Sequence, residues 1–172
     1  MINTEINIQY YQHPYAEFVL GSYEDKLCLC DFRYRKMRES VDYRIQRGLN
    51  ASFVVKNNHI LDTTKTQLEE YFLGGRSVFD LPLLMVGTDF QKSVWKALTS
   101  IKYGKTATYL DLALYIGNKN AVRAVGNANG ANGLAIIVPC HRIIGSQGEL
   151  VGYSGGLSLK KRLLELENSL LI

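Results

Sequence analysis

The sequence pattern changes near residue 87, and this change is the strongest constraint on how the chain folds. Before it, short apolar or β-branched runs alternate with polar turns, which predicts strands over 18–20, 27–30 and 51–55. After it, the sequence shows helices with clear start and stop signals. We therefore predict an α+β protein with an N-terminal α/β scaffold domain over 1–87 and a second, mostly helical domain over 88–172.

One helix is expected in the first domain, over 66–73, where apolar residues share a face and two glycines follow. The basic stretch 33–38 interrupts the strands, and we interpret it as a solvated loop or sheet edge. Segment 76–87 contains proline and glycine but has no helical period. The domain boundary is therefore placed near Gly87.

Three helices are predicted early in the second domain. Thr88 begins a capping box for the first, which Gly104 ends. Thr108 caps the second, Gly117 ends it, and the third begins after Asn118. Two short helices joined at a glycine suggest a helix-turn-helix, a pattern that many other helical hairpins share.

The spacing of apolar residues predicts which face is buried in the first of these helices and in a further helix at the end of the chain. The first is expected to bury Phe90, Val94, Trp95, Leu98 and Ile101. A last helix over 157–168 is expected to bury Leu157, Leu159, Leu163, Leu164 and Leu166 and to expose Lys160, Lys161 and Arg162.

Composition excludes several classes of protein. The chain has 172 residues, of which 47% are hydrophobic and 21% charged, a balance that excludes wholesale disorder. No apolar run approaches the roughly 20 residues of a membrane helix, and the start shows no secretory signal. The three cysteines do not indicate a disulfide framework. We expect a cytoplasmic protein without a membrane partner.

Charge is distributed unevenly between the two halves. Residues 1–87 carry ten basic and eleven acidic side chains, whereas residues 88–172 carry ten basic and five acidic ones. The net charge of the second half is therefore +5, and that of the whole chain is +4. This modest surplus makes the second half the candidate for a polyanionic partner such as nucleic acid.

Cys140 is the strongest candidate for chemistry. The apolar run 134–138 predicts a buried strand that leads into Pro139, Cys140 and His141. A buried cysteine is usually a small hydrophobe, but a neighbouring histidine favours the reactive thiolate. Neighbours in a strand point to opposite faces, so contact between the two side chains needs a turn or a bridging water. A cysteine hydrolase is one alternative.

The pair Cys28 and Cys30, together with His13 and His59, could suggest a zinc site. No second cysteine pair exists, and alternate strand residues are equally consistent with core positions. We therefore expect no metal and no cofactor.

The segment 137–145 resembles the active-site signature of the O6-alkylguanine-DNA alkyltransferases. The N-terminal half matches only in size and in the helix near 68–72. Over roughly the last half of the chain, the similarity holds in order and spacing at 87–91, 94–95, 103–104, 109, 123–126, 132, 152–157 and 163–167.

The resemblance implies a ribonuclease H-like first domain and a winged-helix-like second domain for DNA binding and alkyl transfer. Cys140 would attack the alkyl carbon on O6 of guanine and stay alkylated, so each molecule acts once. His141 would be the general base, acting through a water, and Glu167 would orient it. Asn132 would brace the active-site turn.

The resemblance also implies binding of double-stranded DNA through the minor groove, with the damaged base flipped out. Arg123 would enter the base stack, and Tyr109 would contact the flipped base and a phosphate. No obligate protein partner is implied, and a monomer is expected. The small residues suited to the groove are Ala121, Ala124, Gly126 and Ala128.

The same resemblance places a guanine pocket around the loop of Tyr153, Ser154 and Gly155, with Ile143 and Lys160 beside it. A donor near Ser154 would bond the guanine oxygen as charge develops there. Lys160 is alternatively a solvated helix lysine. The family often has proline where this chain has Gly133, and some members also have it at the position of Ala135, so the tolerance for bulky alkyl groups is left open. The preferred alkyl group and activity on O4-alkylthymine are open as well.

Three other functions compete with alkyl transfer. An alkylated-DNA sensor binds without reacting, but such proteins lack the cysteine. A helix-turn-helix regulator would read a base sequence in the major groove, whereas repair predicts salt-sensitive binding with weak sequence preference. A cysteine hydrolase would turn over many times.

Overall fold

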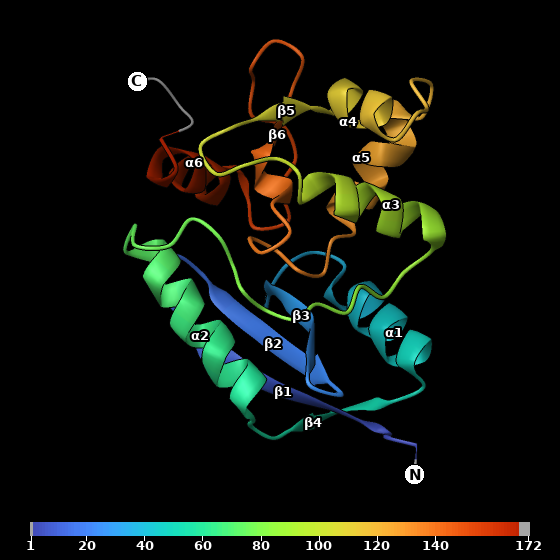
Figure 1. The fold of residues 1–172 in the computed structure, drawn as a ribbon, viewed down its shortest axis with the longest axis vertical. Helices are drawn as coiled ribbons and strands as arrows, with labels where there is room; N and C mark the ends of the chain where they lie inside the picture. Colours follow the sequence, from blue (N-terminus) through green and yellow to red (C-terminus); the bar gives the residue numbers. More distant parts are fainter. Residues whose placement is uncertain (1, 169–172) are drawn as a thin grey trace. The chain divides into compact units, whose positions relative to one another are not determined.

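The computed structural model describes residues 2–168, which divide into two compact units between Gly87 and Thr88 (Figure 1). The elements are those of a mixed α+β protein, as the sequence predicts. The scaffold and DNA-binding roles assigned to the two regions stay predictions.

A four-stranded sheet forms the centre of the first unit, with the order β3-β2-β1-β4. β4 runs parallel to β1, and the other neighbours are antiparallel. The predicted strands over 18–20, 27–30 and 51–55 all fall within this sheet. Its strands are β1 (Glu5–Gln12), β2 (Glu17–Tyr23), β3 (Lys26–Phe32) and β4 (Ser52–Val55).

Two helices bury the two faces of this sheet. On one face, α1 (Arg38–Leu49) packs Val41 and Ile45 onto Ile6 and Ile8. On the other, α2 (His59–Phe72) brings Phe72 to the ring of Phe18, with the centroids 6.1 Å apart. Because both faces are covered, β3 is buried almost throughout, and alternation along it is lost.

Helix α1 was not predicted, because its start lacks a sequence signal. Its N-cap is Met37, whose backbone is left-handed at φ 64° and whose side chain makes no capping bond. The expected solvated loop over 33–38 is also wrong in part. The Arg35 and Arg38 guanidinium groups lie 3.2 and 2.9 Å from the carboxylate of Asp31, which is fully buried.

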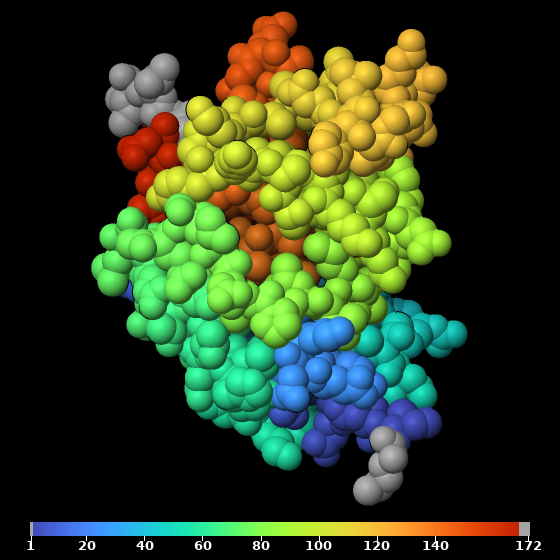
Figure 2. Space-filling model, viewed as in Figure 1, coloured from blue at the N-terminus to red at the C-terminus, as the bar shows by residue number. Residues whose placement is uncertain are grey.

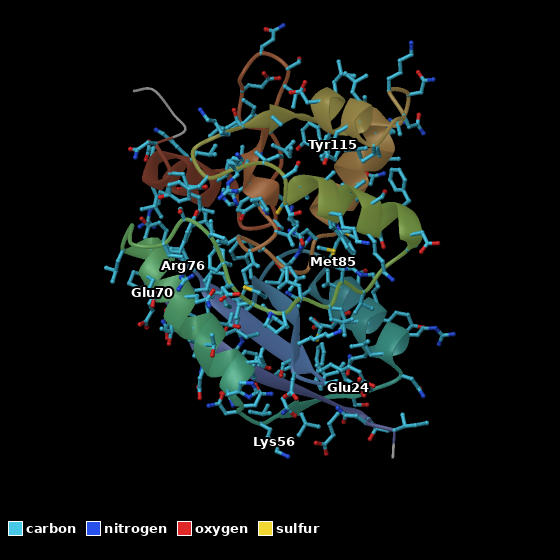
Figure 3. All side chains as sticks on the ribbon, in the orientation of Figure 1. Glu24, Lys56, Glu70, Arg76, Met85 and Tyr115 are labelled. Carbon is cyan, nitrogen blue, oxygen red and sulfur yellow. The ribbon has the colours of Figure 1, made fainter. Side chains whose placement is uncertain are left out.

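The segment after α2 returns to the edge of the sheet. Arg76 pairs with Glu70 at 2.7 Å, as the two labelled side chains in Figure 3 show, and also donates to the Val78 carbonyl. Further on, the Leu27 amide donates to the Pro82 carbonyl, and the Leu27 carbonyl accepts from Leu84. These bonds cover the exposed edge of β3, which would otherwise be free to pair with another chain.

The second unit begins with α3 (Asp89–Leu98), and its capping box at Thr88 is present as predicted. The helix ends at Leu98 rather than continuing toward Gly104. Its expected core residues Val94, Trp95 and Leu98 are buried, but Phe90 is 36% exposed, so its predicted burial is wrong.

A short strand, β5 (Ala107–Thr108), precedes the predicted pair of short helices, α4 (Tyr109–Tyr115) and α5 (Val122–Gly130). Thr108 and Asp111 form the capping box of α4, and Gly117 turns the chain at φ 81°. The Trp95 indole donates to the Ala128 carbonyl at 2.9 Å, which fixes α5 to α3. The α4–α5 hairpin contributes to the surface shown in Figure 2, and exposed Tyr115 ends α4 (Figure 3).

The last helix, α6 (Leu157–Leu166), buries Leu159, Leu163 and Leu164, as predicted. Two expectations are wrong: Leu157 is 47% exposed, and Lys160 is completely buried rather than solvated. Among residues 2–168, none of the helices has the length and apolar character needed to cross a membrane.

Candidate active site

The apolar run 134–138 is buried, but it is a compact turn and not the predicted strand. Ile136 adopts a left-handed backbone at φ 71°, and the Ile137 amide donates to the Ala135 carbonyl at 2.8 Å. Only one isolated bridge, between Ala135 and Val138, has strand character. The chain therefore reverses just before Cys140.

Asn132 holds the two sides of this turn together. Its side-chain nitrogen donates to the Val138 carbonyl at 2.9 Å, and its side-chain oxygen accepts from the Leu134 amide at 2.9 Å. Because Asn132 is only 2% exposed, these bonds satisfy backbone groups that water does not reach. The resemblance assigned Asn132 a bracing position, and its contacts are of that kind.

Cys140 opens a 3₁₀ turn, Cys140–Arg142. Successive residues of such a turn point about 120° apart, so Cys140 and His141 are not on opposite faces, as they would be in a strand. The Cys140 amide donates to the Val138 carbonyl at 2.8 Å. The thiol is free of any disulfide, and the residue is 2% exposed.

Strand pairing brings Tyr109 to the same region. β6 (Ile143–Ile144) follows the 3₁₀ turn and pairs in parallel with β5. The pair Thr108–Ile144 places the start of α4 directly beside the cysteine segment. Ile143, predicted to line the substrate pocket, is completely buried in this pairing. Burial, followed by the neighbouring Cys140, raises the pKa of the Tyr109 phenol.

A buried ionic network lies next to Cys140. His141 Nε2 and Glu167 Oε2 are 2.5 Å apart, and both side chains are completely buried. Arg142 forms a fork on the other carboxylate oxygen, with Nε 2.7 Å and Nη2 2.6 Å from Oε1. Glu167 directly follows α6, so the end of that helix delivers the carboxylate.

Burial and charge act together on the pKa values in this network. Burial lowers the pKa of His141, while the hydrogen bond and charge of Glu167 oppose the shift. Burial alone would raise the pKa of Glu167, but His141 and Arg142 outweigh it and keep that pKa below its usual value. The arrangement is a neutral imidazole beside an ionised carboxylate.

The His141 ring has one nitrogen engaged and one open. Glu167 Oε2 accepts a hydrogen bond, so Nε2 carries the proton, and Nδ1 keeps its lone pair. Nδ1 is buried and has no hydrogen-bond partner among the described protein groups. The ring is therefore arranged as a proton acceptor at Nδ1.

Lys160 and Tyr109 meet at the carbonyl of Val151. Lys160 Nζ donates to this oxygen at 2.9 Å and to the Gly152 carbonyl at 3.3 Å, and the Tyr109 hydroxyl donates to it at 3.4 Å. Burial lowers the pKa of Lys160 to about 8, and the charge of Cys140 opposes that shift. The loop expected to wall the pocket is thus attached to α6.

The other predicted pocket residues follow in this loop. The Tyr153 ring lies edge-on to His141, with the centroids 6.4 Å apart. Tyr153, Ser154 and Gly155 are half-buried, and the Gly156 amide closes a turn onto the Tyr153 carbonyl. The loop therefore borders the His141 side of the site.

The predicted DNA-binding residues lie along α5 and are not equivalent. Arg123 and Ala124 are exposed, and Ala121 is half-buried. A side chain at Gly126 would meet the Tyr109 ring at 3.8 Å. Ala128 is 2% exposed and packs inside the unit, so its predicted place at a groove is wrong.

The first unit shows no comparable chemistry. Cys28 and Cys30 are buried in β3, and His13 stacks on Phe72 at 4.3 Å. Within residues 2–168, no three His, Cys, Asp or Glu side chains are grouped in a way that would hold a metal ion.

Two participants were not predicted from the sequence. Arg142 was recognised only as part of the motif, and its bond to a carboxylate 25 positions away has no local signal. The Val151 carbonyl is a backbone group, and residue type gives no indication that it accepts from two side chains.

The second unit is similar in sequence to a known family of DNA-binding domains. The family domain described as "6-O-methylguanine DNA methyltransferase, DNA binding domain" matches residues 89–169. A methylated-DNA–protein-cysteine methyltransferase of Methanosarcina barkeri is 53% identical over 115 residues, which cover 67% of this chain and 73% of the relative. One from Mycobacterium tuberculosis is 56% identical over 103 residues, covering 60% and 62%.

Solved structures agree. The Mycobacterium tuberculosis O6-methylguanine methyltransferase superposes with a TM-score of 0.79 at 38% identity, covering 95% of this chain and 93% of that one. The same TM-score is found for the Mycobacterium tuberculosis protein in complex with DNA, over 96% of this chain. These similarities define the chain as a DNA-binding methyltransferase. The chain belongs to the methylated-DNA–protein-cysteine methyltransferase family.

Proposed function

We propose that this protein repairs DNA by moving an alkyl group from O6 of guanine to its own Cys140, once per molecule. Family membership supports the activity. The observation that carries the assignment to Cys140 is the adjacent His141, whose Nε2 is bound to Glu167 and whose Nδ1 is open. No other cysteine in the chain has such a neighbour.

The proposed chemistry is a direct displacement. His141 Nδ1 takes the thiol proton through a water, and Glu167 stabilises the resulting imidazolium. The thiolate attacks the alkyl carbon, so an S–C bond forms while the C–O6 bond breaks. The electron pair of that bond stays on guanine, which takes up a proton. Water does not displace the thiolate from the C–S bond of the resulting thioether, so the cysteine stays alkylated.

Because Cys140 is buried, its thiol cannot reach a guanine that stays stacked in the duplex. O6 of guanine lies inside a duplex, so the nucleotide has to be flipped out, which costs a few kcal/mol. Arg123 projects from α5 and is exposed, which suits insertion into the vacated stack. We place α5 in the minor groove of double-stranded DNA, with its exposed Ala124 allowing close approach. The net charge of +5 on residues 88–172 favours phosphate-dominated binding.

The remaining features of the proposal concern the pocket and the wider molecule. The half-buried loop of Tyr153, Ser154 and Gly155 would hold guanine, with a donor near Ser154 serving O6. Tyr109 would donate to the departing base. The ribonuclease H-like first unit serves as scaffold to a winged-helix-like second one. The protein acts in the cytoplasm as a monomer without a cofactor.

The test is intact-mass analysis after incubation with a duplex that contains O6-methylguanine. We expect a gain of one methylene per molecule, which stops at one and is absent in Cys140→Ala. Cys28→Ala is the matched control and gains the same mass, because Cys28 is a buried thiol without a neighbouring base. Binding without mass gain would identify a sensor, and repeated turnover on other substrates would identify a hydrolase.

A further inference from the structure

We infer that Arg142 is a positioning residue for transfer: its guanidinium holds Glu167 ionised and oriented, and thereby sets the proton-accepting state of His141. This inference rests on the proposed transfer to Cys140. It assigns to the arginine that follows the Cys-His pair a role in catalysis through Glu167, without contact to substrate.

The guanidinium is fixed at both ends of its fork. Nε and Nη2 lie 2.7 and 2.6 Å from Glu167 Oε1, and Nη1 donates to the Ile101 carbonyl at 2.5 Å. Arg142 is 7% exposed, so water does not compete for these bonds. Two charge-assisted bonds to one carboxylate oxygen, made by a guanidinium that is itself anchored to a backbone carbonyl, restrict the position of that oxygen and favour the ionised carboxylate.

The end of α6 needs such a cation. A carboxylate at a helix C-terminus faces the negative end of the helix dipole, which disfavours its charge. Segment 101–104 lies against this end, where Tyr103 donates to the Leu166 carbonyl at 3.2 Å. A side chain at Gly104 would lie 3.1 Å from the Glu167 carbonyl, so the backbone approaches closely. Arg142 supplies the positive charge that makes an ionised Glu167 acceptable there.

The two carboxylate oxygens differ in their main partners. Oε1 accepts the two short bonds from Arg142, while Oε2 accepts from His141 Nε2 and, at 3.4 Å, from Arg142 Nε. Without Arg142, Oε1 would be buried without its charged donor, and the carboxylate would be free to rotate or to take a proton. Either change releases the Nε2–H bond that keeps the lone pair of His141 on Nδ1.

All charged and titratable groups around His141 enter the prediction. Glu167 attracts a proton to the ring, whereas Arg142 and Lys160 repel one. Cys140 precedes His141 in the chain, and the Tyr153 phenol lies edge-on to it. Removal of Arg142 takes away one of the two repelling cations, but it also lets the Glu167 carboxylate rotate or take a proton. Because Glu167 is the direct partner of the ring, its loss should prevail, and the imidazole should bind its proton less tightly.

The experiment compares Arg142→Met with Arg142→Lys. The first measurement follows the His141 ring by NMR titration of the DNA-free protein, with the signal assigned through His141→Gln. The second is the single-turnover transfer rate to an O6-methylguanine duplex as a function of pH. For Arg142→Met, we expect the ring titration and the acid limb of the rate profile both to move down by about 1 pH unit. An upward shift of both would contradict the inference, because it would show only the loss of a repelling cation with Glu167 still in place. Arg142→Lys keeps the charge and should keep both midpoints while lowering the rate.

Tyr103→Phe is the matched control, since it removes a bond at the end of α6 but leaves the arginine fork intact; it should move neither midpoint. The inference is overturned if Arg142→Met lowers the rate by one factor at every pH with the ring titration unchanged. Should Arg142→Met not fold, Arg142→Lys decides alone: a full wild-type rate would show that the fork does not position Glu167. The ring titration uses no substrate, so it is independent of a failure of alkyl transfer itself.

Discussion

Both units bury a carboxylate against arginine, and the two clusters differ in one partner. In the first unit, Asp31 lies between two guanidinium groups, those of Arg35 and Arg38. In the second, Glu167 lies between Arg142 and His141, and a histidine titrates near neutrality. The first arrangement only joins β3 to the start of α1, whereas the second contains a group that exchanges protons.

The cysteines show the same contrast. Burial raises the pKa of Cys28 to about 12, and burial together with the charge of Asp31 also raises that of Cys30; neither thiol is followed by a histidine. Cys140 is as well buried, at 2% exposed, but it opens a 3₁₀ turn that presents His141 next to it. Burial by itself therefore makes a thiol inert, and the local turn with its neighbours makes the difference.

The largest effect should come from removing the charge that supports the base. Glu167→Gln leaves the size of the side chain unchanged but weakens stabilisation of the His141 imidazolium. We expect the single-turnover transfer rate to fall by about 10²- to 10⁴-fold, the usual contribution of general-base catalysis. The measurement is quenched transfer from an O6-methylguanine duplex, with binding of the duplex followed separately.

Glu165→Gln is the control for that change, since Glu165 lies on the same helix and pairs with Lys161 at 3.7 Å, away from the histidine. It should transfer at the wild-type rate. If Glu167→Gln also transfers at that rate, the comparison between the two clusters fails, because the Glu167 cluster would then be only structural.

The sequence predicted local events well and distant pairings poorly. Thr88 and Thr108 gave the helix starts, because a capping box is a short-range pattern. Helix α1 begins at a left-handed Met37 without a capping side chain, so no such pattern exists there. The run 134–138 predicted burial but not conformation, since a buried strand and a buried turn have the same composition.

The residues of the site also differ in how well the sequence predicted them. Cys140 and His141 are neighbours in the sequence, and resemblance to a family extended the set to Glu167. The position of Lys160 was misjudged, because three consecutive basic residues on a helix usually face solvent. Its burial depends on the Val151 and Gly152 carbonyls, two backbone acceptors in a loop that ends before the helix begins.

The first cluster should instead control stability. Asp31→Asn leaves two buried guanidinium groups without the anion between them, and we expect a loss of about 3 kcal/mol in the free energy of unfolding. Urea unfolding followed by far-UV circular dichroism measures this loss, and the transfer rate of the folded protein should not change. The only tryptophan, Trp95, lies in the second unit, so its fluorescence reports that unit separately.

The matched control is Asp25→Asn, which changes an exposed residue in the β2–β3 turn and should leave the urea midpoint within experimental error. A loss of transfer rate in folded Asp31→Asn would mean that the first unit contributes to chemistry. The Asp31 cluster would then not differ from the Glu167 cluster in function.

The smallest effect should come from Lys160, the buried lysine of the second unit. Its folded pKa is about 8, below the usual value of 10.5, so between these values the unfolded chain binds a proton that the folded chain does not. Stability of the second unit should therefore rise with pH from about 8 to about 10.5, and below pH 8 Lys160 adds no slope. Urea unfolding of Lys160→Met, followed by Trp95 fluorescence, should lack this rise, whereas Lys161→Met, a change at the exposed neighbour, should retain it. An identical rise in Lys160→Met would show that another group titrates there, and that Lys160 is not the source of the pH dependence.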